Sequence, residues 1–141
     1  MKKFRKNTRL RGYDYSQSGL YYVTVCTNYK EKILWNENSD LSPAGKIVDD
    51  CIKFIDANYE NVVIDKYCIM PNHIHLIIVL GCNPHNRCDV SLETVIGLLK
   101  SGITRQIHKE EPEEKIWQRS FHDHIIRNQK SYEKIWLYIE S

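Results

Sequence analysis

The sequence predicts an α+β domain in which strands and helices follow the order βαββαβ, with a further helix at the C-terminus. Three observations lead to this fold class. Short runs rich in β-branched and aromatic residues alternate with longer segments whose apolar residues recur at helical spacing. Met70-Pro71-Asn72 forms a turn between the two middle runs. The length of 141 residues suits a single domain over residues 1–141.

The first half of the chain contains two strands around one helix. Gly19 precedes a run of tyrosine, valine and threonine that predicts a strand over 20–27. Ser42-Pro43 opens a helix over about 43–58, because proline is favoured in the first helical turn. The apolar residues of 62–69 then predict the second strand.

The second half repeats this pattern. The third strand begins at His73, and a polar loop covers 81–89. Ser91 caps a helix that runs to about residue 109, residues 116–126 form the fourth strand, and about 129–141 form the last helix. This order is the ferredoxin-like split βαββαβ sandwich, an antiparallel four-stranded sheet with strand order 4-1-3-2. The third strand is then central, and the helices must leave part of one sheet face open.

Composition excludes several classes of protein. The apolar fraction of 42% and the charged fraction of 27% are ordinary for a soluble domain. No apolar run approaches the roughly 20 residues that span a bilayer. The N-terminus lacks the apolar segment of a secretory signal. The five cysteines are odd in number, which favours reduced thiols in a cytoplasmic protein over a disulfide framework.

Positive charge is concentrated at the N-terminus. Residues 1–12 form an arm without an acidic residue, and the rest of the chain carries 14 basic against 18 acidic residues, a net charge of −4. A basic arm on a mildly acidic body favours a polyanionic partner such as DNA or RNA, although a solvated, disordered terminus has the same composition. The basic residues of the arm are Lys2, Lys3, Arg5, Lys6, Arg9 and Arg11.

His73 and His75 are the most informative residues of the chain. Side chains alternate along a strand, so both imidazoles point to one face, with Cα atoms roughly 7 Å apart. Two histidines on an apolar strand are costly to bury without partners, which favours a metal site. A structural hydrogen-bonded pair and a zinc site are alternatives, although no third zinc ligand of matching spacing is evident.

Two other groups of residues have open interpretations. Cys82, His85 and Cys88 could hold zinc on the polar loop, but only three ligands are local. His122 and His124 share a strand face. They could support the metal ligands from behind, face DNA, or be plain strand surface. Trp117, Arg119 and Phe121 are interpreted as packing and edge residues, although an exposed aromatic could stack on a base.

The two later helices each combine an apolar and a polar face. In the second, six apolar residues from Leu92 to Ile107 face the sheet, and the opposite side is usually solvated but could contact nucleic acid. That polar side carries Lys100 at its boundary, Ser101, Thr104, Arg105 and His108. In the last helix, Tyr132 belongs to an apolar stripe, whereas Tyr138 lies about 120° from its centre.

An exposed tyrosine near a two-histidine metal site suggests phosphoryl-transfer chemistry. A phenol has a pKa near 10 and is a weak nucleophile at neutral pH. A divalent metal can polarise a phosphodiester oxygen and offset charge in the transition state. Tyr138 could then attack phosphorus and form a covalent phosphotyrosine, which keeps the phosphodiester energy for rejoining the strand elsewhere.

These residues resemble the single-tyrosine HUH transposases, and most closely the REP-associated tyrosine transposases of bacteria. The name HUH denotes histidine, hydrophobic residue, histidine, which is His73-Ile74-His75 within "MPNHIHLIIV". Further matches follow in the family's order over nearly the whole chain. They are "RLRGYDYSQSGLYYVTVCT", "LLKSGITRQI", "WQRSFHDHIIRN" and "YEKIWLYIES".

The resemblance implies an activity as well as a fold. It implies a metal-dependent transposase that cleaves single-stranded DNA beside hairpins, with Mg²⁺ or Mn²⁺ as cofactor. His73 and His75 match the metal ligands, and Tyr138 matches the nucleophile that takes the 5′-phosphate. A homodimer is expected as well. The basic arm (Lys3, Arg5, Lys6, Arg9, Arg11) and the polar face of the second helix (Lys100, Ser101, Thr104, Arg105) would contact the hairpin.

One part of the family motif lies beyond the sequence. The family continues after the tyrosine as Tyr-Ile-x-x-Asn-Pro, and the amide four residues after the tyrosine completes the metal site. The sequence ends at Ser141, three residues after Tyr138. Two explanations for this missing part are open: the chain was cut short, or the gene is a decayed copy. The alternative function is a hairpin-binding protein that no longer cleaves, and a replication initiator or relaxase-like domain is a more distant alternative.

Overall fold

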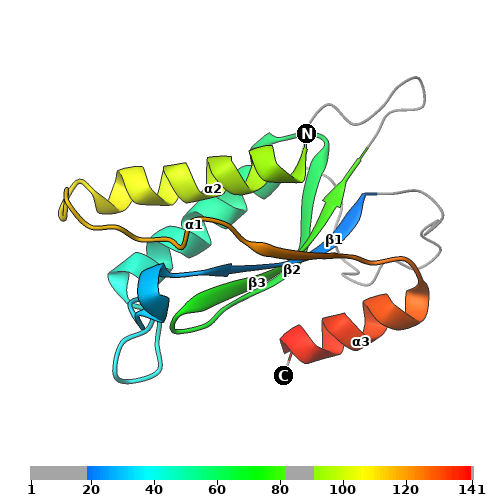
Figure 1. The fold of residues 1–141 in the computed structure, drawn as a ribbon, viewed down its shortest axis with the longest axis horizontal. Helices are drawn as coiled ribbons and strands as arrows, with labels where there is room; N and C mark the ends of the chain where they lie inside the picture. Colours follow the sequence, from blue (N-terminus) through cyan, green and yellow to red (C-terminus); the bar gives the residue numbers. More distant parts are fainter. Residues whose placement is uncertain (1–18, 82–90, 141) are drawn as a thin grey trace.

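The computed structural model describes residues 19–81 and 91–140, in which strands and helices alternate as the sequence predicts (Figure 1). A short 3-10 turn, η1 (Asn28–Lys30), follows the first strand. The strands are β1 (Leu20–Cys26), β2 (Val62–Ile69), β3 (His73–Leu80) and β4 (His122–Ile125), and the helices are α1 (Pro43–Asn58), α2 (Leu92–Ile107) and α3 (Gln129–Glu140).

The four strands form one antiparallel sheet in the order β2-β3-β1-β4. This is the predicted order 4-1-3-2, with β3 in the middle, so the ferredoxin-like α+β fold is confirmed. Helices α1 and α2 cover one face of the sheet, and α3 lies on the other face (Figure 1). The face that carries α3 is therefore only partly covered, as expected.

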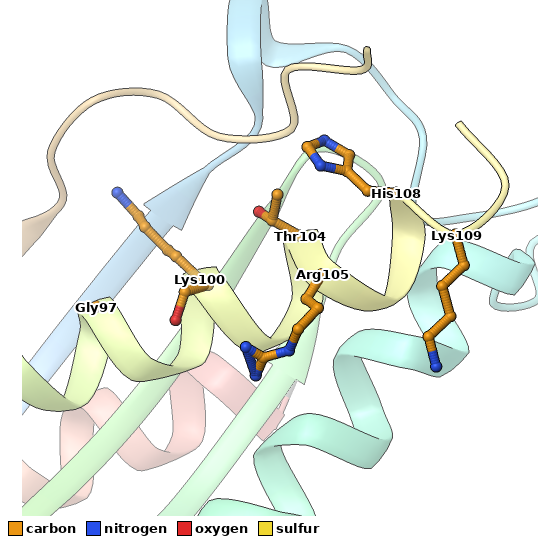
Figure 2. Close-up of a pocket in the computed structure, with 7 residues that line it drawn as sticks. Gly97, Lys100, Thr104, Arg105, His108 and Lys109 are labelled. Atoms are coloured by element: carbon orange, nitrogen blue, oxygen red, sulfur yellow. The ribbon is translucent and has the colours of Figure 1, made fainter. Parts of the chain in front are cut away.

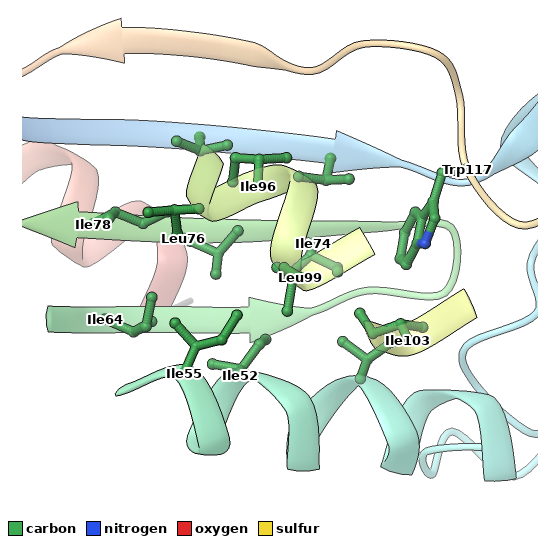
Figure 3. Close-up of a cluster of buried hydrophobic side chains, with 14 of the residues drawn as sticks. Ile52, Ile55, Ile64, Ile74, Leu76, Ile78, Ile96, Leu99, Ile103 and Trp117 are labelled. Carbon is green, nitrogen blue, oxygen red and sulfur yellow. The ribbon is translucent and has the colours of Figure 1, made fainter. Parts of the chain in front are cut away.

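The helices begin where the sequence predicts. The Ser42 hydroxyl accepts the amide of Gly45 at 3.0 Å, and the Ser91 hydroxyl accepts the amide of Thr94 at 3.1 Å. Each bond satisfies one of the amides that a helix N-terminus leaves without a partner. The six apolar residues of α2 that were predicted to face the sheet are all buried. They pack with α1 and the sheet in the main core (Figure 3).

The fourth strand is shorter than the predicted 116–126. Residues 116–118 do run beside the end of β1, where the amide of Gln118 donates to the Cys26 carbonyl at 3.0 Å. The chain then leaves the sheet before β4 begins at His122. In this stretch, the Lys100 ammonium donates to the carbonyls of Gln118 and Ser120 at 2.9 and 3.1 Å. A side chain of α2 therefore takes backbone acceptors of the predicted strand. Trp117 packs in the core, as predicted.

Strand β2 contains an irregularity that the sequence analysis did not predict. Ile64 pairs with Ile78 and Lys66 pairs with Ile77, so Asp65 is an extra residue in β2. Such a bulge shifts the alternation of side chains by one residue. Asp65 and Lys66 both interact with α3, whereas Ile64 and Ile69 on either side of them belong to the main core.

Some predicted features lie outside the described residues. These are the basic arm with Lys3, Arg5, Lys6, Arg9 and Arg11, and the possible zinc ligands Cys82, His85 and Cys88. Three cysteines, Cys26, Cys51 and Cys68, are described, and each is a free thiol. Over residues 19–81 and 91–140, the structure contains no helix that is both long enough and apolar enough to cross a membrane.

Candidate active site

Strand β3 places the two histidines on one face of the sheet, as its alternation predicts. Ile74 and Leu76 point to the opposite face and are fully buried in the main core. His73 and His75 are half-buried, and their rings meet edge to face with centroids 4.6 Å apart. The core residues thus fix the strand, and the strand holds the two imidazoles together on its other side.

Hydrogen bonds connect both rings to neighbouring side chains. The Nε2 atoms of His73 and His75 lie 3.0 Å apart. Nδ1 of His73 lies 2.7 Å from the side-chain oxygen of Asn72. Nδ1 of His75 lies 2.9 Å from the Tyr22 hydroxyl and 3.3 Å from the Thr24 hydroxyl, both on β1. All four ring nitrogens therefore have a polar neighbour, and the two Nε2 atoms face each other.

The surroundings keep both imidazoles neutral at neutral pH. Burial and, as a smaller cause, the neighbouring His73 together lower the pKa of His75 to about 4. Burial also lowers the pKa of His73, with an additional contribution from the charge of Lys30. Neutral imidazole is the form that binds metals.

The pair fits a divalent cation, although it is not a complete site. Two ligands at right angles around an ion, each about 2.1 Å from it, are about 3 Å apart, which matches the separation of the two Nε2 atoms. Within the described residues, no group of three or more histidine, cysteine or acidic side chains could hold a metal ion. The two histidines could thus supply two ligands of such an ion.

Helix α3 brings Tyr138 to the same place. The Tyr132 hydroxyl donates to the buried carboxylate of Asp65 at 2.6 Å, and Lys66 pairs with Glu140. These contacts attach α3 to the bulged part of β2. Tyr138 is 62% exposed, and its ring lies edge to face against His75 with centroids 5.6 Å apart. The structure therefore brings together the three residues that the motifs single out.

The polar face of α2 lies on the other side of the sheet from this site (Figure 1). Its residues line a surface hollow of about 670 Å³, formed with Gly97, His108 and Lys109. In Figure 2, Lys100 and Arg105 point to different sides of α2. Lys100 binds backbone carbonyls, and its burial lowers its pKa. The predicted DNA-binding residues of α2 are thus close together, but they are not adjacent to His75.

The edge strand adds two histidines to the face that carries the site. His122 pairs with Thr24, and His124 pairs with Tyr22. Directly opposed residues in an antiparallel pair point to the same face, so His122 and His124 share the face of Tyr22 and Thr24. All four residues of β4 are exposed. This orientation fits all three interpretations of the pair, so its role stays a prediction.

Comparison with known families decides the family membership. A profile described as "Transposase IS200 like" matches residues 16–141. The chain belongs to the IS200-like transposase family. This result confirms the resemblance to the single-tyrosine transposases that the sequence motifs indicate.

Two proteins of Haemophilus influenzae are similar to this family member. One, an uncharacterized protein, is 30% identical over 156 residues, which covers 97% of this chain and 87% of that protein. The other, provisionally named a REP-associated tyrosine transposase, is 32% identical over 128 residues. The match covers 83% of this chain and 65% of that protein.

Two solved structures of transposases have the same fold. The structure of a REP-associated tyrosine transposase bound to a REP hairpin matches with a TM-score of 0.65 and 21% identity, over 99% of this chain and 70% of that one. A transposase structure from Deinococcus radiodurans matches with a TM-score of 0.57 and 20% identity, over 99% of this chain and 96% of that one.

The sequence analysis missed the partners of His75. Tyr22 and Thr24 lie more than fifty residues before it, and their alternation on β1 shows only that they share a face. Their position opposite His75 follows from the pairing of β1 with β3. It also missed Asp65, although an acidic residue inside an apolar strand is a signal that could have been used.

Proposed function

We propose that this member of the IS200-like transposase family cleaves and rejoins single-stranded DNA beside a hairpin, through a 5′-phosphotyrosine on Tyr138. The observation that carries the proposal is the position of the Tyr138 ring, 5.6 Å from that of His75, beside two Nε2 atoms that are 3.0 Å apart. A nucleophile and a pair of neutral imidazoles on one open surface suit transfer at a phosphodiester.

In the proposed cleavage step, the hydroxyl oxygen of Tyr138 attacks phosphorus and loses its proton. A bond forms between this oxygen and phosphorus, and the bond from phosphorus to the 3′ oxygen of the preceding nucleotide breaks. The 3′ oxygen takes up a proton and leaves as a 3′-hydroxyl. Attack by another 3′-hydroxyl reverses the step, releases Tyr138 and joins two strands.

His73 and His75 would hold the cofactor, which we propose to be Mg²⁺ or Mn²⁺. The chemistry that this cation supplies when bound is polarisation of a phosphodiester oxygen and compensation of the charge that develops there. The two residues fit this task because both are neutral and present Nε2 atoms to one point. The third ligand is expected beyond Ser141, as the resemblance implies.

The proposed substrate is a DNA hairpin with an unpaired strand. The similar solved transposase that binds a REP hairpin supports this substrate class. We propose that the basic arm and the α2 residues Ser101, Thr104 and Arg105 contact the hairpin. We propose that His122 and His124, which share the sheet face of His75, contact the unpaired strand. A homodimer belongs to the same proposal, and sedimentation velocity would test it.

The test is a covalent-adduct assay on a denaturing gel. The substrates are single-stranded hairpins from the DNA that flanks the gene, with Mg²⁺ or Mn²⁺. The proteins are this chain, a version extended past Ser141 and Tyr138→Phe in each. Tyr132→Phe is a matched control, because it removes a hydroxyl from the same helix while Tyr138 remains.

We expect a protein–DNA adduct that disappears with Tyr138→Phe and with a chelator, and that persists with Tyr132→Phe. If only the extended chain forms an adduct, the amide ligand beyond Ser141 is required. If hairpins bind but neither length forms an adduct, the proposed cleavage is wrong and a hairpin-binding protein is the better description.

A further inference from the structure

Tyr22, on β1, makes a hydrogen bond and a stacking contact with His75. Its hydroxyl lies 2.9 Å from Nδ1, and the two rings are nearly parallel, with an interplanar angle of 24° and centroids 5.7 Å apart. The hydroxyl of Thr24 lies 3.3 Å from the same nitrogen. Two hydroxyls of β1 therefore stand at one side of the His75 ring, and His73 stands at the other.

The distances determine the direction of each hydrogen bond in the metal-free protein. His73 donates from Nδ1 to the Asn72 side-chain oxygen, so its Nε2 carries a lone pair. His75 must then donate from Nε2 to His73, since a neutral imidazole has one proton and two lone pairs cannot share a 3.0 Å contact. Nδ1 of His75 is left as an acceptor, and Tyr22 donates to it.

Binding of a cation requires the proton of His75 to lie on the other ring nitrogen. Both Nε2 atoms must then carry lone pairs, so the proton of His75 lies on Nδ1. Nδ1 now donates to Tyr22 or Thr24. A hydroxyl can both donate and accept, whereas a carboxylate could only accept and an ammonium could only donate. A hydroxyl at this position is thus compatible with both arrangements of His75.

Tyr22 also lies near the nucleophile. Burial raises the pKa of Tyr22, a hydrogen bond with Thr24 lowers it, and the charge of Tyr138 raises it again. Tyr138 is therefore within electrostatic range of Tyr22.

We propose that Tyr22 is a positioning residue of this site, whose hydroxyl bonds Nδ1 of His75 in either tautomer and thereby holds the ring with Nε2 oriented toward His73 and a cation. The inference rests on the proposed function, because it assumes that His75 is a ligand. Hydrogen-bond partners of this kind fix the tautomer and the orientation of metal-bound histidines, and their loss typically weakens metal binding.

The first experiment determines the protonation of the imidazole nitrogens by ¹⁵N NMR, on the full chain without metal. For the wild type, we expect the proton of His75 on Nε2 and that of His73 on Nδ1. In Tyr22→Phe, Nδ1 of His75 loses its main donor, and we expect its ¹⁵N signal to shift toward that of an imidazole nitrogen without a hydrogen bond. Tyr21→Phe is the matched control, because Tyr21 points to the other face and packs on the main core. Identical His75 signals in wild type and Tyr22→Phe would overturn the proposal.

The second experiment measures Mn²⁺ binding by electron paramagnetic resonance. We expect Tyr22→Phe to weaken binding by about 10-fold to 100-fold, and Tyr22→Phe/Thr24→Val to weaken it further. Tyr21→Phe should bind like the wild type. Equal affinity of Tyr22→Phe and wild type would contradict the proposal. If the wild type itself binds no Mn²⁺, the metal of the proposed function is wrong, and the metal-free spectra still decide the role of Tyr22.

Discussion

Lys100 and Arg105 lie on the same helix, but their surroundings differ. The ammonium of Lys100 donates to the carbonyls of Gln118 and Ser120, which holds the segment before β4 against α2. Arg105 is exposed at the surface hollow of α2. One basic side chain of the predicted DNA-binding face therefore has a structural task, and the other is available to a phosphate.

We expect Lys100→Ala to lower stability and Arg105→Ala to affect hairpin binding instead. Lys100→Ala should lower the free energy of unfolding by about 1–2 kcal/mol, because two charged hydrogen bonds at a partly exposed site are lost. Arg105→Ala should change it by less than about 0.5 kcal/mol and should reduce the salt dependence of hairpin binding by about one phosphate contact. Urea unfolding and binding titrations at two salt concentrations measure both quantities. A stable Lys100→Ala protein would show that its hydrogen bonds are not structural.

At the scale of residues, alternation and motif positions were enough to select His73, His75 and Tyr138. The structure brings all three together. Alternation gives no register between strands, however, so the Tyr22 and Thr24 hydroxyls could not be assigned to His75. Lys100 was placed at the boundary of the polar face, but its carbonyl partners depend on the path of residues 118–120, which no local pattern determines.

Among the elements, α3 has the most direct effect on the site because it carries Tyr138. Its apolar side packs on Leu20, Ile77 and Ile126. Its polar contacts are made with the bulge of β2. Tyr132 donates to Asp65. The Lys66 ammonium pairs with Glu140 and lies 4.1 Å from the Trp136 ring centroid. Two successive residues of one strand therefore hold both ends of the helix.

We expect Tyr132→Phe to loosen α3. The hydrogen bond from Tyr132 to the buried Asp65 carboxylate is lost, which should cost about 1–3 kcal/mol of stability. Amide hydrogen exchange should become faster in α3, and the yield of the covalent adduct should fall without being abolished. Tyr67→Phe is the control, since it removes a hydroxyl that bonds Asp49 of α1 on the other face. If exchange in α3 rises equally in both variants, the Asp65 contact does not hold the helix specifically.

The bond between Tyr67 and Asp49 should have a pH-dependent effect. Burial raises the pKa of Asp49, but hydrogen bonds from Tyr67 and Lys53 and the charge of Lys53 lower it below its ordinary value of 3.8. A carboxyl group whose pKa is lowered by folding stabilises the fold at pH values above its pKa in the unfolded chain. This stabilisation is lost as the pH falls through its pKa in the folded protein. The stability difference between wild type and Tyr67→Phe, below about 1 kcal/mol, should therefore shrink under pH 3.8 in urea titrations. A constant difference would argue against ionised Asp49 as the acceptor.

At the scale of elements, periodicity predicted the type and order of all strands and helices. The helix limits agree within about two residues, because the Ser42 and Ser91 caps and the apolar stripes are local signals. Two features were not predicted, namely the bulge within β2, whose bounds were correct, and the late start of β4. Both depend on contacts with distant segments, namely α3 for the bulge and Lys100 for the start of β4. Asp65 stands out in its apolar run, but only the pairing of β2 with β3 shows that it is an extra residue.

At the scale of the whole molecule, the sheet separates the polar face of α2 from the surface that carries His75 and Tyr138. Helices α1 and α2 form a layer on one face of the sheet, and the histidine pair with α3 occupies the other (Figure 1). A hairpin that contacts Arg105 and also reaches Tyr138 must therefore pass around an edge of the sheet. The basic arm adds six positive charges to a body with a net charge of −4.

We expect the arm to dominate the electrostatics of hairpin binding. Deletion of residues 1–12 should weaken binding and should lower the slope of log affinity against log salt by up to about 5, if all six charges contact phosphates. Fluorescence anisotropy over a range of salt concentrations measures this slope. An unchanged slope would show that the arm makes no phosphate contacts and that α2 supplies the electrostatic term.

The extra residue in β2 has a consequence for the evolution of this sheet. Val62 and Ile64 before it, and Ile69 after it, face the main core, so a chain without Asp65 would keep a regular alternation and an uninterrupted ladder. Such a deletion would make the strand pairing regular, but it would remove the carboxylate to which Tyr132 donates a hydrogen bond. Selection for stability alone would then favour the loss of Asp65, and its retention would signal selection for the placement of Tyr138.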